Sequence, residues 1–95
     1  MGKVIELQFK DGEVWQIPFE FVAKHRADYY GNKESHGPKE RQEEIDFVMN
    51  DDYEGHDWLK NNMEYGDFKE VVNIIPNTNP QTKDWINAEA IIKEV

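Results

Sequence analysis

Apolar and polar residues alternate over the first seventeen positions of the chain. The apolar members of this pattern are Ile5, Leu7, Phe9, Trp15 and Ile17. A period of two is typical of half-buried strands. Asp11-Gly12, which separates the two alternating runs, is a strong signal for a tight turn. The pattern therefore predicts a β-hairpin over residues 3–17.

The register of this hairpin does not follow directly from its turn. A two-residue turn at Asp11-Gly12 would set Phe9 opposite Val14, whereas matching the apolar faces sets Phe9 opposite Trp15. A slip of one residue would move every side chain to the other face of the sheet. We therefore expect a bulge or a longer loop near Glu13–Val14 to absorb the misfit.

The hydrophobic period changes after Pro18, a residue that suits the first turn of a helix. The next apolar and aromatic positions fall on one helical stripe, namely Phe19, Val22, Ala23, Ala27 and Tyr30. Gly31 is a candidate C-terminal cap. The polar residues 31–39, with two glycines and one proline, predict a loop.

Two further helices are expected, over residues 40–50 and 56–65, with Gly55 as an interruption between them. The first places Ile45, Val48 and Met49 on one face. The second does the same with Trp58, Leu59, Asn62 and Met63. The β-branched run at residues 70–76 then predicts a buried strand that Pro76 ends.

The last eleven residues fit two interpretations. A helix would place Trp85, Ala88, Ile92 and Val95 on one face. Alternatively, residues 85–87 form a strand, 88–90 a turn and 91–95 a second strand. We favour the strand interpretation, because it supplies partners for the strand at residues 70–76.

These elements predict a single domain, residues 1–95, of the α+β class. A small antiparallel sheet is expected from the hairpin at residues 3–17 and the C-terminal strands at 70–95, with two or three helices from the central segment 18–65. A chain of this length buries roughly 60–65% of its unfolded surface. Twelve aromatic residues supply much of the area that such a core needs, and we expect Trp15, Trp58 and Trp85 to serve there rather than to stack on bases.

The negative charge of the chain is concentrated in its centre. Residues 40–70 hold eleven Asp/Glu against three Lys/Arg, a net of −8, whereas the whole chain carries −9. Such a segment disfavours phosphate binding and favours a basic partner surface, a metal or simple solvation. The side chains that we single out for binding a basic protein surface are Asp51, Asp52, Glu54 and Asp57.

The same segment lacks a convincing metal or catalytic motif. Asn50-x-Asp52-x-Glu54-Gly55 resembles the opening of a calcium loop, but its twelfth position is Asn61 instead of a bidentate glutamate. The three histidines are widely spaced and the chain has no cysteine. We expect no catalytic residues, no metal, no cofactor and no enzymatic activity.

No stretch of the sequence approaches the ~18 consecutive apolar residues of a membrane span. The first residues alternate and soon become charged, unlike the apolar region of a signal peptide. We therefore expect a soluble cytoplasmic protein that does not bind membranes.

Two stretches of the chain resemble the Sm/Lsm family of small barrels. VIELQFKDGEVWQI is similar to the first strand pair of that family, and Asp46-Phe47-Val48-Met49-Asn50 has the D-x-x-M-N spacing of its first motif. The resemblance implies that the sheet curves into an Sm-like barrel and that the chain is an RNA-binding oligomer. Asp46 and Asn50 would then line a base-binding pocket.

Two other stretches, IPFEFVAKHRADYY and WLKNNMEYGDFKE, resemble small uncharacterised bacteriophage proteins. This resemblance brings no activity with it. It implies that the protein is phage-encoded and acts in the cytoplasm of the host cell.

Three functions stay open at this point. The first is a small non-enzymatic interaction protein that presents an acidic helical face. The second is an Sm-like RNA binder that uses a locally basic loop, for which Lys24, Arg26, Lys33 and Lys39 are the candidates. The third is an acidic mimic of nucleic acid. Strands near both ends of the chain leave an unpaired sheet edge, so we also expect a homo-oligomer.

Overall fold

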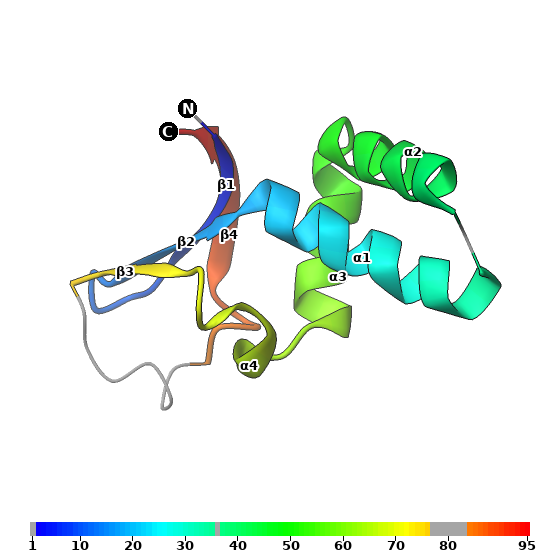
Figure 1. Ribbon diagram of the computed structural model, residues 1–95. Coiled ribbons are helices and arrows are strands. Elements are labelled where there is room, and N and C mark those ends of the chain that lie inside the picture. Colours follow the sequence, from blue (N-terminus) through cyan, green and yellow to red (C-terminus); the bar gives the residue numbers. More distant parts are fainter. Residues whose placement is uncertain (1, 36, 77–83) are drawn as a thin grey trace.

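The structure is a computed structural model that describes residues 2–35, 37–76 and 84–95. It has the α+β architecture expected from the sequence (Figure 1). Its elements are, in chain order, β1 (Lys3–Gln8), β2 (Val14–Pro18), α1 (Phe19–Glu34), α2 (Pro38–Met49), α3 (Asp52–Asn62), α4 (Tyr65–Phe68), β3 (Asn73–Ile75) and β4 (Glu89–Glu94).

The four described strands form one antiparallel sheet in the order β3-β2-β1-β4. The expected Sm-like barrel is wrong, because this sheet is open. β3 and β4 lie at opposite edges of it, and no pairing between described strands closes the ring. β3 has only three residues, which leaves too short an edge for closure.

The hairpin of β1 and β2 has a longer loop than a two-residue turn, as predicted, but the extra residue is Lys10 and does not lie near Glu13–Val14. The amide of Phe9 donates to the carbonyl of Glu13 at 3.0 Å, which leaves three residues, 10–12, in the loop. Gly12 lies at a φ of +92°, a left-handed conformation that suits the last position of such a loop. The expected pairing of Phe9 with Trp15 is wrong, since Trp15 stands opposite Leu7. The observed register differs from the expected one by two residues. An even shift leaves all these side chains on the expected face of the sheet.

Helix α1 starts directly after Pro18 as predicted, but it continues past Gly31 to Glu34. Ser35, at a φ of 55°, takes the left-handed conformation expected of Gly31 and donates its amide to the carbonyl of Gly31. The predicted loop over residues 31–39 is correspondingly shorter. A glycine inside a helix costs only about 1 kcal/mol, which the packing of α1 against α2 can offset.

Helix α3 also begins earlier than predicted and contains Gly55 instead of stopping at it. Gly55 is buried, and the ring of Phe19 occupies the space that a side chain at position 55 would fill. A glycine in a helical pattern indicates either the end of the helix or a close approach of another group to the backbone. At Gly55 the ring of Phe19 makes such a close approach.

The strand interpretation of the C-terminal residues is confirmed for β4 but not in its details. Trp85 lies in a turn, not in a strand, and is buried in the core. β4 pairs with β1 rather than with β3, and β3 pairs with β2. The segment predicted as a buried strand contributes only Asn73–Ile75 to the sheet, where Asn73 and Ile75 are exposed.

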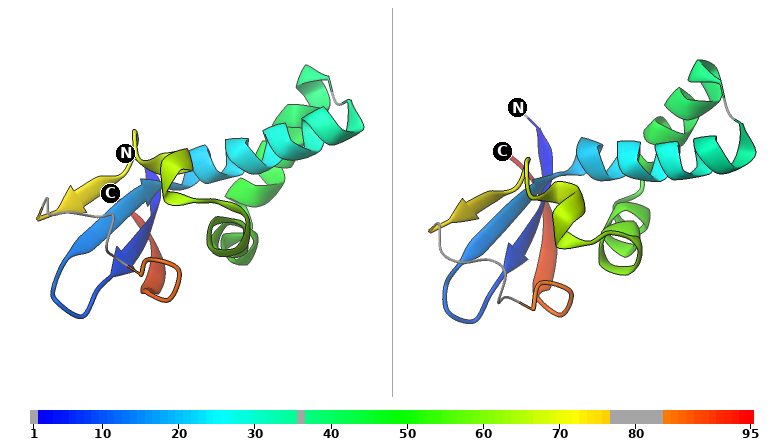
Figure 2. Two further views of the ribbon diagram at one scale, coloured as in Figure 1. Left: turned by 90° about the horizontal axis from the view of Figure 1, so that it is seen from below. Right: turned by 60° about the horizontal axis from the view of Figure 1, so that its bottom comes forward.

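The molecule is elongated, with principal extents of 43 × 24 × 20 Å. Helices α1, α2 and α3 pack on one another beside the sheet instead of lying flat across it (Figures 1 and 2). One buried cluster runs through both parts and includes all three tryptophans, as expected. None of the helices in the described ranges combines the length and the apolar character that crossing a membrane requires.

Candidate functional site

The four acidic residues singled out from the sequence already have partners within the chain. Asp51 caps the N-terminus of α3, where its Oδ1 accepts the amide of Glu54 at 3.2 Å. The carboxylate of Asp52 pairs with the ammonium of Lys3 at 2.5 Å. Asp57 accepts a hydrogen bond of 2.9 Å from Asn61. These contacts therefore help to fix α3, and the role of the four residues in binding a partner stays a prediction.

Asp46 and Asn50, the two residues matched by the Sm/Lsm resemblance, lie at the C-terminal end of α2. The Asn50 amide group donates to the backbone carbonyl of Asp46 at 2.8 Å, and Gln42 donates to the Asp46 carboxylate at 2.9 Å. Asn50 borders a cavity of about 620 Å³ between this helix end and the sheet, but Asp46 does not line it. The structure thus gives both residues local roles at the end of a helix.

The exposed side of α2 carries acids that sequence reasoning did not single out. Glu40, Glu43 and Asp46 are exposed there, at spacings that place them on one side of the helix. Phe47, also on this side, is 51% exposed. Residues 38–62, which span α2 and α3, hold eight Asp/Glu against three Lys/Arg, a net of −5.

Arg26 of α1 connects this side of α2 with the two other long helices. Its guanidinium binds the carboxylate of Glu44 on α2 at 2.7 Å and lies 3.9 Å from the carboxylate of Glu54 on α3. The guanidinium carbon is 5.4 Å from the ring centre of Phe47 and 5.9 Å from that of Trp58. Arg26 is itself mostly buried, so it serves as the centre of the cluster and not as a free cation.

Aromatic rings extend this cluster across α1 and α3. Tyr30 lies 5.0 Å from the Arg26 guanidinium, and its ring is 5.7 Å from the ring of Trp58. Tyr29, which is 50% exposed, packs 5.4 Å from Trp58. We call this set the aromatic–arginine surface, defined by Arg26, Tyr29, Tyr30, Phe47 and Trp58.

Trp58 is held in this surface by a histidine on α1. Its indole N–H donates to Nδ1 of His25 at 2.9 Å, and Nε2 of His25 lies 3.9 Å from the carboxylate of Asp67. His25 is therefore half-buried and hydrogen-bonded, although it lies off the apolar stripe of α1. No local sequence pattern could reveal this contact, because 33 residues separate its two partners.

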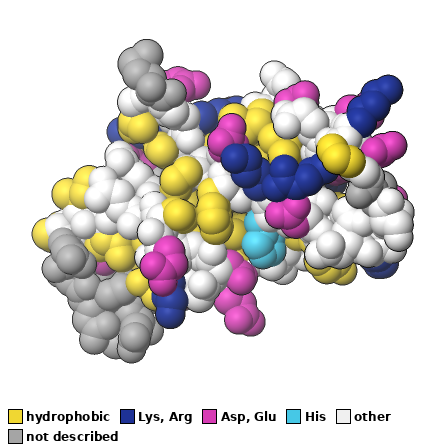
Figure 3. All heavy atoms as spheres, viewed as in Figure 1, with side chains coloured by type: hydrophobic (Ala, Val, Ile, Leu, Met, Phe, Trp, Pro, Cys, Tyr) yellow, Lys and Arg dark blue, Asp and Glu magenta, His cyan; other side chains and the backbone are white. Residues whose placement is uncertain are grey.

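The expected basic loop is wrong, because its residues lie in helices. Lys24, Arg26 and Lys33 belong to α1, and Lys39 belongs to α2. Lys24 pairs with Glu20 at 3.2 Å, and Arg26 pairs with Glu44. On the face drawn in Figure 3, the Lys and Arg side chains over α1 have Asp and Glu on both sides. The basic charge of α1 is thus largely compensated within the chain.

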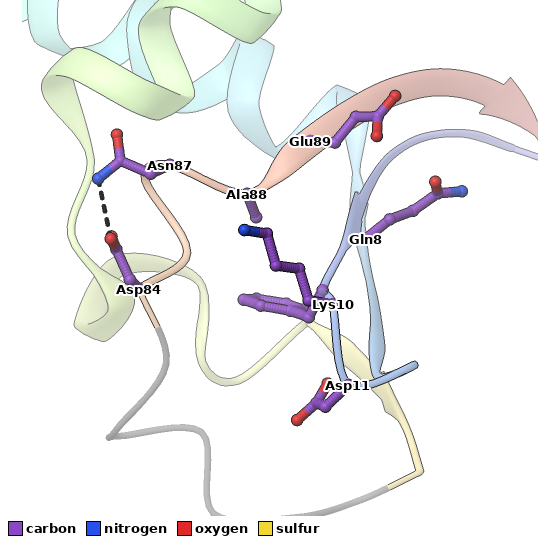
Figure 4. A pocket seen from close by; sticks show the side chains of 8 residues that line it. Gln8, Lys10, Asp11, Asp84, Asn87, Ala88 and Glu89 are labelled. Atoms are coloured by element: carbon purple, nitrogen blue, oxygen red, sulfur yellow. Dashed lines mark hydrogen bonds between the residues drawn. The ribbon is translucent and has the colours of Figure 1, made fainter.

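A second cavity, of about 580 Å³, lies at the loop end of the hairpin (Figure 4). Its charged lining consists of Lys10, Asp11, Asp84 and Glu89. Asn87 closes one side by donating to the Asp84 carboxylate at 2.8 Å. In the described part of the chain, no three His, Cys, Asp or Glu side chains are grouped so that they could hold a metal ion.

Lys60 of α3 fixes the turn that borders this cavity. Its ammonium donates to the backbone carbonyls of Trp85, Ile86 and Ala88 at 3.0, 2.5 and 2.7 Å. Burial lowers the pKa of Lys60, whereas the carboxylate of Asp84 acts in the opposite direction. The lysine thus ties the helices to the C-terminal strand.

A buried carboxylate lies on the face of the sheet opposite the core. Glu6 accepts hydrogen bonds from Gln8 at 2.9 Å and from Gln16 at 3.0 Å, and it pairs with Lys93 at 3.1 Å. The two glutamine hydrogen bonds, and then Lys93, hold its pKa below the ordinary value. All of these partners come from the sheet, so the network has a structural role.

Comparisons of the chain with protein-family models, with curated proteins and with solved structures found no match. The resemblances to the Sm/Lsm family and to bacteriophage proteins therefore stay predictions.

Proposed function

We propose that the protein is a non-enzymatic binding module that recognises a basic protein surface. The binding site consists of the aromatic–arginine surface together with the exposed acids of α2. The observation that carries this proposal is the pair of half-exposed rings, Tyr29 and Phe47, on different helices: Phe47 lies against Arg26, and Tyr29 packs on Trp58.

The two exposed rings of this surface, Tyr29 and Phe47, rest on the mostly buried side chains of Trp58 and Arg26. Tyr, Trp and Arg are the residue types that contribute most to protein interfaces, and they do so best when they are already rigid. Arg26 is fixed by Glu44, and Trp58 is fixed by His25. Because Tyr29 packs on Trp58 and Phe47 packs on Arg26, we expect both rings to lose little side-chain entropy when a partner covers them.

The surrounding charge defines the chemistry of the partner. Lys and Arg side chains of a partner can stack on exposed rings, with about 0.5–1 kcal/mol for each cation–π contact at an exposed site. Glu40, Glu43 and Asp46 beside Phe47 would pair with the same cations and speed up encounter. A nucleic acid, in contrast, would be repelled, since phosphate binding depends on Lys and Arg contacts.

Affinity capture with matched variants tests this proposal. The double variant Tyr29→Ser with Phe47→Ser removes the two exposed rings, and Ile75→Ser with Ile86→Ser removes two equally exposed apolar side chains elsewhere, at 48% and 50%. We expect a protein captured from a bacterial lysate by the wild-type chain to be lost with the first variant and retained with the second. Equal capture by both would contradict the proposal.

Competition separates the acidic mimic from this function. If the captured protein binds nucleic acid and is displaced from the chain by DNA or RNA, the acidic face imitates nucleic acid. We expect instead that displacement requires a basic polypeptide. Direct binding of short U-rich or A-rich RNA to the chain at low salt would favour the Sm-like alternative.

A further inference from the structure

The two edges of the sheet are built differently. β3 has three residues and is followed directly by Pro76, so it is a short edge of the kind that natural proteins use to prevent strand addition. β4 has six residues and an unbroken register with β1, from Glu89 opposite Gln8 to Glu94 opposite Lys3. Among the described strands, β4 pairs on one side only.

Hydrogen bonding at the end of β4 shows which backbone groups point outward. Gly2 and Val95 exchange both of their backbone hydrogen bonds, at 3.0 and 2.8 Å. In an antiparallel pair every second residue pair does this. Lys93, Ile91 and Glu89 therefore direct their N–H and C=O groups to β1, and Ala90, Ile92 and Glu94 direct theirs away from the sheet.

This outward row has a defined beginning. The amide of Ala88 donates to the carbonyl of Trp85 at 3.2 Å, and the carbonyl of Ala88 accepts from Lys60. Both backbone groups of Ala88 are thus already hydrogen-bonded within the chain. The outward backbone N–H and C=O groups that can pair with another strand are therefore those of Ala90, Ile92 and Glu94.

The centre of β4 lacks the usual devices that protect an edge strand, and its two glutamates, Glu89 and Glu94, lie at the ends of the strand. The strand has neither a proline nor a bulge. Its single lysine, Lys93, turns to the buried Glu6 on the face of the sheet and does not guard the edge. Beside it, Ile91 and Val95 are 38% and 49% exposed. An open edge with exposed apolar side chains is a surface for pairing with another strand.

We propose that β4 is a dimerisation edge and that its partner is the β4 strand of a second copy of this chain. An antiparallel pair centred on Ile92 sets Ile92 opposite Ile92 of the second copy and Ala90 opposite Glu94. All three outward residues then exchange hydrogen bonds. The same register sets Ile91 opposite Lys93, so no like charges face one another directly. A strand pair centred on Glu94 would instead set Glu94 opposite Glu94 of the second copy.

This interface is small, and each copy carries a net charge of −9. One strand pair buries less than the about 1,600 Å² of a standard interface, so we expect a weak dimer. Because salt screens the repulsion between the two copies, association should become stronger as the ionic strength rises. Binding of a basic extended peptide to the same edge would instead become weaker as the ionic strength rises. The proposal does not rest on the binding site of the helices, which lies on other elements.

Two measurements on the wild-type chain test the proposal. Sedimentation velocity at concentrations up to about 1 mM, where weak complexes are populated, should show the mass rise toward that of a dimer, more so at higher salt. Amide hydrogen exchange should slow with concentration at Ala90, Ile92 and Glu94. A monomer at every concentration, or slowed amides elsewhere, would overturn the proposal. So would protection of these amides by an arginine-rich peptide alone.

Variants of the strand make the test specific for the register. Ala90→Pro removes an outward amide without removing a hydrogen bond to β1 and should abolish the dimer, whereas Ala90→Ser should retain it. Ile91→Lys places like charges opposite each other in the dimer and should abolish it, whereas Ile91→Gln should weaken it less. A dimer that survives both Ala90→Pro and Ile91→Lys would overturn the proposed pairing. If Ala90→Pro fails to fold, the hydrogen-exchange data on the wild-type chain serve as the test in its place.

Discussion

The ring of Phe19 packs directly against the backbone of Gly55. A Cβ atom at position 55 would overlap Cζ and Cε2 of that ring. Phe19 is the first residue of α1 and Gly55 lies in the second turn of α3, so this contact brings the start of one helix against the other. It fixes the position of α3, which carries Trp58 of the aromatic–arginine surface.

Gly55→Ala should therefore destabilise the protein although alanine is the better helix former. The gain in helix propensity is at most about 1 kcal/mol, whereas overpacking a closely packed site typically costs about 1–3 kcal/mol. Urea unfolding followed by tryptophan fluorescence measures the difference. Gly66→Ala is the matched control, since nothing lies within 4 Å of a Cβ at that position. Equal effects of the two substitutions would show that Phe19 does not constrain Gly55.

The hydrogen bond from Trp58 to His25 makes a second prediction possible. His25→Leu leaves the indole N–H of Trp58 without its acceptor, and an unsatisfied buried donor costs about 1–3 kcal/mol. His25→Asn keeps an oxygen acceptor near the position of Nδ1 and should lose less. Denaturant unfolding gives the stabilities, and the NMR shift of the Trp58 indole proton reports the bond. An unchanged indole shift in His25→Leu would contradict this contact.

Glu6 predicts how acid affects stability. Its pKa is lowered in the folded state by Gln16, Gln8 and Lys93, so its contribution is present above the unfolded pKa of about 4.5 and is lost as the pH falls through the folded value. Glu6→Gln should be less stable than the wild type at pH 7, and the gap should narrow below about pH 4.5. Glu43→Gln, at an exposed position on α2, is the control. A gap that stays constant across this range would refute the prediction.

Lys60→Met should loosen the turn at residues 85–88. The substitution keeps most of the apolar stem but removes the three hydrogen bonds to backbone carbonyls. Because hydrogen bonds to charged groups contribute about 1.5–3 kcal/mol, we expect a loss of that order and faster amide exchange in β4. Lys24→Met, which removes only an exposed i,i+4 pair, should change stability by less than about 0.5 kcal/mol. Similar effects of the two would argue against the role of Lys60.

The parts of the fold that could be predicted are those that local patterns determine. The alternation around Asp11-Gly12 identified the hairpin, and the spacing after Pro18 identified the start of α1. Strand pairing could not be predicted in the same way, because β3 and β4 choose their neighbours through contacts that are distant in sequence. The role of Gly55 cannot be predicted from local sequence for the same reason, since its neighbour Phe19 lies far away along the chain.

The candidate site was harder to predict than the fold. Charge counting identified the acidic segment correctly, but it could not show that Asp51 would serve as a cap or that Asp52 would pair with Lys3. Phe47 lies outside the apolar stripe of α2, and this position is the one sequence feature that indicates its exposure. Its position beside Arg26 depends on how α1 and α2 pack.

The binding function can be tested most directly by NMR titration with a short arginine-rich peptide. Two variants provide a control for charge: Glu43→Lys with Asp46→Lys changes α2, and Glu70→Lys with Glu89→Lys changes residues elsewhere. Each pair of substitutions adds four positive charges and brings the net charge from −9 to −5. Any difference between the variants therefore reports position and not total charge.

We predict that the peptide shifts the signals of Phe47, Tyr29 and their neighbours in the wild type. The Glu43→Lys/Asp46→Lys variant should lose these shifts, and the Glu70→Lys/Glu89→Lys variant should keep them. Shifts spread evenly over the acidic residues, or equal losses in both variants, would contradict a basic-partner site on α1 and α2.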